Sequence, residues 1–159
     1  MEIIDYSNRR GAIVHLLPQV YAMLKKDRKD MPNIILWNIE MKQYVLDINI
    51  KWVFALAGKK EVLGILFYRV GKDGSSLYIE ELQAINATVA EALIKKFEQT
   101  DIVKTKTTFY ASQDIKRMES EEILETVGLQ DESVFNEEGY QPLGSLNDTV
   151  KALRLRYIR

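Results

Sequence analysis

The sequence contains no cysteine, which excludes disulfides, thiolate metal ligands and cysteine nucleophiles. It contains one histidine, His15. With a single histidine and no cysteine, a catalytic zinc site lacks its usual ligands, and we expect no metal site. The chain also has no G-x-S-x-G pattern, so a Ser–His–Asp triad has no support in the sequence.

Neither charge sign is in excess and no long apolar run is present. Lys and Arg number 22 against 23 Asp and Glu, a formal charge of −1. Such a balance lacks the positive footprint of a nucleic-acid-binding protein, so we expect no nucleic-acid partner. The first ten residues lack the pattern of a secretory signal, and no apolar run approaches the roughly 18 residues of a membrane span. We therefore expect a soluble, cytoplasmic protein without a membrane partner.

Residues 1–159 contain no repeat, no low-complexity tract and no Pro/Gly/Ser-rich linker, which favours a single domain. After a short strand at 2–5, apolar residues recur with helical spacing over 13–24 and 34–48. Pro18 interrupts the first of these segments, so we expect a kink or a second helix that begins there.

The remainder of the chain alternates strands and helices. Three β-rich runs, at 51–57, 61–70 and 77–84, form a predicted antiparallel meander. A helix at 88–99, a strand at 105–112, a second helix at 114–127 and a closing strand at 149–158 follow. The strands on either side of the first helix should pair in parallel, because a strand–helix–strand unit of this length favours that direction. The predicted fold is α+β, with helices flanking a mixed, mostly antiparallel central sheet.

This order of elements, with "LYIEELQA" followed by "TVAEALIKKF", resembles the GNAT superfamily of acyl-CoA-dependent N-acetyltransferases. The resemblance covers nearly the whole chain and is most specific between Lys51 and Ser112. In that family a glycine-containing loop of the form Q/R-x-x-G-x-G/A joins the fourth strand to a helix. Backbone N–H groups of the loop and of the helix start bind the pyrophosphate of CoA, because unpaired helix N-terminal amides attract anions.

The resemblance implies a binding site for acetyl-CoA as co-substrate. It implies that strand amides around Leu82, Gln83 and Ala84 pair with pantetheine. The helix start would face the pyrophosphate, through Ala87, Thr88, Val89 and Ala90. Arg117 could approach a phosphate. No alignment of the loop motif places a glycine in this sequence. The residues 88–91, "TVAE", instead form a capping-box pattern, with Thr88 as the predicted N-cap and Glu91 as its partner.

The candidate catalytic residues are Glu80, Glu81 and Tyr110. Amine acetylation needs a base, and the base of this family is often a glutamate on the fourth strand, where Glu80 and Glu81 lie. Because successive strand residues face opposite sides, we expect only one of them to face the cleft. The alternative is that one is solvated and the other pairs with a basic residue such as Arg69. Tyr110, at the end of the fifth strand, offers the nearest hydroxyl for protonating the leaving thiolate.

Two functions stay open at this stage. The resemblance implies an N-acetyltransferase that transfers an acetyl group from acetyl-CoA to a small-molecule or peptide amine. The alternative is a non-catalytic GNAT-like binding or regulatory module that has lost normal CoA binding, which the missing glycines and the capping box favour. The closing strand at 149–158 could also form an edge that pairs two subunits as a homodimer.

Overall fold

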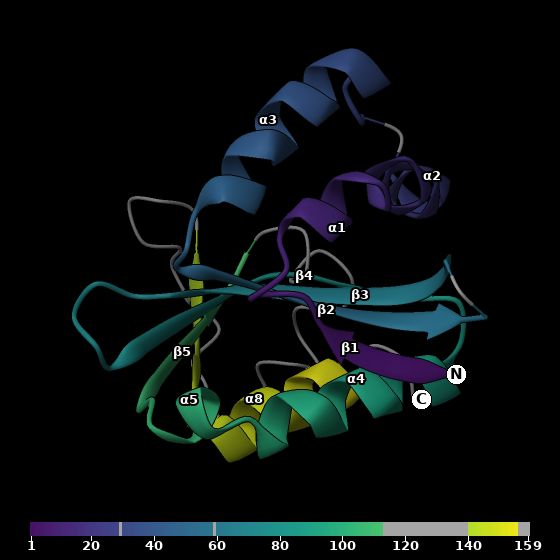
Figure 1. The fold of residues 1–159 in the computed structure, drawn as a ribbon. Coiled ribbons are helices and arrows are strands. Elements are labelled where there is room, and N and C mark those ends of the chain that lie inside the picture. Colours follow the sequence, from purple (N-terminus) through teal and green to yellow (C-terminus); the bar gives the residue numbers. More distant parts are fainter. Residues whose placement is uncertain (29, 59, 113–139, 156–159) are drawn as a thin grey trace.

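A computed structural model describes residues 1–28, 30–58, 60–112 and 140–155. Figure 1 shows its helices on both faces of one sheet. The elements are, in chain order, β1 (Glu2–Asp5), α1 (Gly11–Val14), α2 (Leu17–Asp27), α3 (Ile34–Leu46), β2 (Ile50–Ala57), β3 (Glu61–Val70), β4 (Ser76–Ala84), α4 (Ala87–Gln99), α5 (Asp101–Lys104), β5 (Thr108–Ala111), β6 (Gln141–Gly144) and α8 (Leu146–Leu155).

The sheet has six strands in the order β1-β2-β3-β4-β5-β6. All described neighbours pair antiparallel except β4 and β5, which pair in parallel. This confirms the predicted α+β fold with a mixed, mostly antiparallel sheet. The parallel pair follows the predicted strand–helix–strand unit, because α4 carries the chain back to the starting end of β4.

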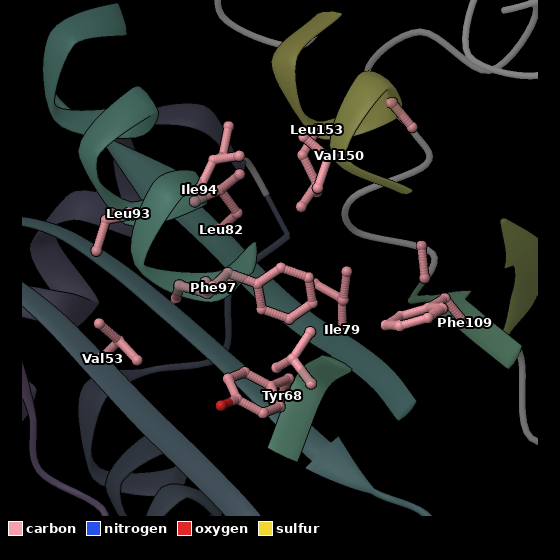
Figure 2. Close-up of a cluster of buried hydrophobic side chains, with 14 of the residues drawn as sticks. Val53, Tyr68, Ile79, Leu82, Leu93, Ile94, Phe97, Phe109, Val150 and Leu153 are labelled. Atoms are coloured by element: carbon pink, nitrogen blue, oxygen red, sulfur yellow. The ribbon is translucent and has the colours of Figure 1, made fainter. Parts of the chain in front are cut away.

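Two apolar cores lie on opposite faces of the sheet. The first packs the sheet against α4 and α8 and includes Leu82, Leu93 and Phe97, which Figure 2 shows with the neighbouring side chains. The second packs α1, α2 and α3 on the other face, around Trp37 and Trp52. The strands are therefore buried on both sides, and a polar side chain that points toward α1–α3 lies between layers.

The predicted break at Pro18 is confirmed as a second helix. α1 ends at Val14, and α2 begins at Leu17 with the proline in its first turn, a position where the missing N–H would have had no partner. His15 between them is exposed.

The prediction of a closing strand at 149–158 is wrong. Residues up to Leu155 form helix α8, and Val150 and Leu153 share its buried face. Ser145 and Asp148 exchange hydrogen bonds at its start, at 3.2 and 3.3 Å, so a local capping box overrides the alternating pattern. The predicted homodimer edge depended on that strand, which the described residues do not contain. β6 is, conversely, a strand that the sequence did not predict.

Candidate functional site

A β-bulge in β4 determines how the two glutamates point. Glu81 is opposite Phe67 and Ile79 is opposite Tyr68, so Glu80 is an extra residue without a position of its own on β3. A bulge interrupts the alternation of side chains, and both carboxylates consequently line one cavity on the α1–α3 face. The expectation that only one of the glutamates faces the cleft is therefore wrong.

The cavity lies between the α2–α3 region and the sheet, with a volume of about 210 Å³. Its described lining combines acidic, aromatic, thioether and basic side chains, from Leu24, Arg28, Met31, Pro32, Trp37, Glu40, Met41, Tyr44, Phe67, Glu80 and Glu81. Tyr21 donates a hydrogen bond to the carbonyl of Pro32 and stacks on Trp37, with ring centroids 5.3 Å apart. These contacts hold the α2–α3 connection as one wall of the cavity.

The Glu80 carboxylate contacts an arginine and a tyrosine. Its Oε1 lies 3.1 Å from Nη2 of Arg69, and the Tyr140 hydroxyl donates to the same oxygen. Arg69 also donates to the Tyr140 hydroxyl at 3.3 Å. The ion pair confirms Arg69 as the partner named in the alternative, but neither glutamate is solvated, because both side chains are buried and paired. Burial, followed by the hydrogen bond to Glu80, raises the pKa of Tyr140 well above its usual range, so this hydroxyl keeps its proton.

The Glu81 carboxylate is paired with Arg28, the C-cap residue of α2. The Glu81 side chain is 3% exposed and that of Arg28 12%. The pair ties the end of α2 to the middle of β4. Glu80, with a side chain 9% exposed, is the more accessible of the two acids.

Tyr140 is a site residue that the sequence did not reveal. It directly precedes β6, the strand that was not predicted, so no local pattern marked it. The predicted Tyr110 is half-buried on β5 and stacks on Tyr78, with ring centroids 4.9 Å apart, and Tyr78 in turn meets the Tyr140 ring edge-on. The structure thus brings Tyr110 into the same aromatic cluster as the tyrosine that donates to Glu80.

All of β5 pairs with the first part of β4. The last matched pair is Ile79 with Ala111, where β5 ends, whereas β4 continues to Ala84. Of the predicted pantetheine-binding residues in this continuation, Leu82 and Gln83 are buried and Ala84 is half-buried. Leu82 points into the core beneath α4, as Figure 2 shows.

The start of α4 differs from the predicted capping box. Asn86 is the N-cap, and its Oδ1 accepts the N–H of Val89 at 3.0 Å. Asn86 has the extended backbone that an N-cap needs and is a better capping residue than threonine. Glu91 lies one turn into the helix and pairs with Arg154 of α8, at 2.8–3.2 Å. The prediction of Thr88 as N-cap is therefore wrong.

The four predicted pyrophosphate-binding positions at this helix start divide into two pairs. The amides of Val89 and Ala90 are used within the chain, by the side chain and the carbonyl of Asn86. Ala87 and Thr88 are exposed, and among the described residues no acceptor contacts their N–H groups. The first two amides of α4 are thus available to an anion, as is usual for a helix N-terminus.

A glycine on β3 lets α4 approach the sheet closely at this point. A Cβ built at Gly64 would lie 2.8 Å from Cγ1 of Val89 and 2.9 Å from the carbonyl oxygen of Gln83. Any larger residue would push the helix start away from the end of β4. Gly64 therefore fixes the distance between the exposed amides of α4 and the strand that precedes them.

Arg117 and the helix predicted at 114–127 lie outside the described residues. Within the part of the chain that the structure describes, no cluster of three or more metal-ligating side chains occurs. No helix there is long and apolar enough to span a bilayer.

No protein-family model matches the chain, and no curated protein matches it. Solved structures do match. Tetrahymena GCN5 is similar with a TM-score of 0.55 and 14% identity, over 77% of this chain and 76% of that one. The aminoglycoside 6'-N-acetyltransferase from Enterococcus faecium is similar with a TM-score of 0.50 and 10% identity, over 70% of this chain and 60% of that one. The chain has the GNAT fold, and at these identities the likeness concerns the fold alone.

Proposed function

We propose that the protein is an N-acetyltransferase that transfers an acetyl group from acetyl-CoA to an amine. One observation carries the proposal: β4 continues beyond Ile79, its last residue paired with β5, places two carboxylates in a cavity, and leads into a helix with two exposed amides. The co-substrate and the amine would thus meet at the same strand. Acetyl-CoA supplies the activated acetyl group.

In this proposal the residues of β4 and α4 bind the co-substrate. Backbone groups of Leu82, Gln83 and Ala84 lie along the pantetheine, and the N–H groups of Ala87 and Thr88 contact the pyrophosphate. Two amides at a helix start attract an anion through the helix dipole as well as through direct hydrogen bonds. The amides of Val89 and Ala90 already donate to Asn86. We therefore assign these two residues to holding the turn before α4 and not to binding the pyrophosphate.

Glu80 is the proposed base. An ammonium must lose a proton before its nitrogen can attack a carbonyl carbon, and a positioned carboxylate can accept it. Glu80 is more accessible than Glu81, and Arg69 and Tyr140 orient it through Oε1. We assign Glu81 and its partner Arg28 to shaping the cavity. We keep Tyr110 as the acid for the leaving sulfur, since it lies one pair before the last pair between β4 and β5.

The first experiment is thermal melting with acetyl-CoA. A ligand at 100 times its dissociation constant stabilises the folded state by about 2.7 kcal/mol, which is a clear rise in melting temperature. Thiol release in the presence of a panel of amines then tests turnover. Glu80→Gln should lose most of the turnover while keeping the thermal shift, and Glu2→Gln, an exposed acid on β1, serves as the control. If millimolar acetyl-CoA causes neither a rise in melting temperature nor thiol release, the proposal is wrong.

A specific observation favours the second candidate, a non-catalytic module of the same fold. Both candidate bases are paired with guanidinium groups, and an arginine partner lowers the basicity of a carboxylate. The chain also lacks the glycines that let a backbone approach a pyrophosphate. This candidate predicts no thiol release with any amine, and an unchanged melting temperature if CoA binding is lost as well.

A further inference from the structure

The cavity over Glu80 and Glu81 has a volume, apolar walls and a charge that together favour one class of acceptor molecule. We propose that it binds a compact primary amine as a monocation, with an apolar body about as large as an amino-acid side chain. The cavity suits such a ligand better than a polyamine or an aminoglycoside. The inference rests on the proposed function for the reaction but makes a separate claim about what the cavity binds.

The volume sets the size of the ligand. The cavity measures about 210 Å³ and is open to solvent on one side. Pockets for drug-sized ligands span about 300–1,000 Å³. The enclosed part of the cavity is therefore suited to a compact group and is small for a multi-ring sugar.

The walls suit an aliphatic or aromatic body. The indole of Trp37, which stacks on Tyr21, and the ring of Phe67 are fixed and almost completely buried. Met31 and Met41 add thioethers, which adapt to ligands of different outline. These side chains offer apolar contact in the same cavity as the carboxylates, and Phe67 is the direct neighbour of Glu81 on β3, so a ligand with one polar end and one apolar end satisfies both kinds of side chain.

The charges favour a single positive group. Among the described residues, three carboxylates line the cavity, Glu40, Glu80 and Glu81. Two guanidiniums pair with them, Arg28 with Glu81 and Arg69 with Glu80. Among the described side chains these pairs leave one carboxylate, Glu40, which is exposed at the rim of the cavity. Burial, followed by the nearby Glu80 carboxylate, raises the pKa of Tyr44, so its hydroxyl stays neutral and leaves this balance unchanged.

Trp37 provides a direct test that needs no acetyl-CoA. Benzylamine is titrated into the full chain at neutral pH while tryptophan emission is recorded, in parallel with benzyl alcohol, spermine and kanamycin. We expect a saturable change with benzylamine, a weaker or absent response with the other three, and loss of the signal in Trp37→Phe. Equal or tighter binding of benzyl alcohol overturns the charge argument, and tighter binding of spermine or kanamycin overturns the size argument.

The charge of Glu40 is tested by an isosteric variant. Glu40→Gln should weaken benzylamine binding about twofold to fivefold, the effect of one exposed ion pair. Glu2→Gln makes the same change of charge on β1, away from the cavity, and should leave the affinity unchanged. Equal affinity of wild type and Glu40→Gln contradicts a role for this carboxylate.

The two proposals fail in different ways. If benzylamine binds but acetyl-CoA produces neither stabilisation nor thiol release, the enzyme proposal is wrong and the cavity assignment stands. If thiol release occurs with spermine or kanamycin and benzylamine neither binds nor reacts, the enzyme proposal stands and the cavity assignment is wrong.

Discussion

The replacement of Gly64 by alanine tests the geometry at the start of α4. The new Cβ would meet Val89 Cγ1 at 2.8 Å, the Gln83 carbonyl oxygen at 2.9 Å and Leu93 Cδ1 at 3.0 Å. Real Cβ atoms essentially never approach other heavy atoms more closely than 3.0 Å. A rotamer change cannot relieve the contact with Gln83, because that oxygen belongs to the backbone of β4. The helix or the strand must shift.

Two opposing effects set the size of the loss. Overpacking a tight core costs about 1–3 kcal/mol, whereas alanine in place of glycine in a strand favours folding by about 0.5–1 kcal/mol. We therefore expect Gly64→Ala to lower the free energy of unfolding by roughly 1–2 kcal/mol and the melting temperature by about 2–8 °C. The same shift should weaken stabilisation by acetyl-CoA, because the amides of Ala87 and Thr88 move relative to β4.

Calorimetry or circular dichroism measures the melting temperature, and Gly11→Ala is the matched control. Gly11 is the first residue of α1 and has nothing within 4 Å of a built Cβ, so alanine there should be neutral or slightly stabilising. A Gly64→Ala protein that melts at or above the wild-type temperature would refute the close approach of α4 to β3.

Three further predictions concern single side chains. Asn86→Ala removes the cap of α4 and should cost about 1 kcal/mol in chemical denaturation; an unchanged midpoint would argue against this cap. Tyr140→Phe removes a donor to the Glu80 carboxylate and should cost about 1–3 kcal/mol, which a loss below the error of the same measurement would contradict. Arg154→Met should cost less than about 1 kcal/mol, because its pair with Glu91 is partly exposed. The hydrogen bond with Arg154 lowers the pKa of Glu91, so its contribution is present above the unfolded-state pKa and disappears as the pH falls through the folded-state value. A cost that is equal at pH 7 and pH 2 would exclude this linkage.

Most of the fold could be predicted because its elements carry local signals. The strand–turn–strand patterns of β2 and β3, the apolar stripe of α4 and the position of Pro18 each depend on nearby residues. The error at α8 has the same origin. Leu153 and Leu155 alternate with arginines, as in a strand, whereas the Ser145–Asp148 capping box sets the helix. Two local patterns competed, and the capping bonds with burial against α4 decided between them.

The site could be predicted only in part, because its geometry depends on long-range register. The sequence located Glu80 and Glu81 on the fourth strand, and it named Arg69 as a partner. It could not show the bulge, since a bulge is a mismatch between β4 and β3 and leaves no mark within β4 alone. Tyr140 is separated from Glu80 by 60 positions, and its contact forms only when β6 pairs with β5.

The bulge also explains how two adjacent acids can be tolerated in a strand that is buried on both faces. Without it, Glu81 would point toward the core formed with α4, where a carboxylate has no polar partner among the apolar residues of that cluster and burying its charge would be costly. The extra residue returns Glu81 to the α1–α3 face, where Arg28 pairs with it. Buried ion pairs that serve only stability could be replaced by apolar residues at little cost in folding free energy. In this chain the two glutamates instead line a cavity with a third carboxylate at its rim, which is consistent with the proposed cationic amine.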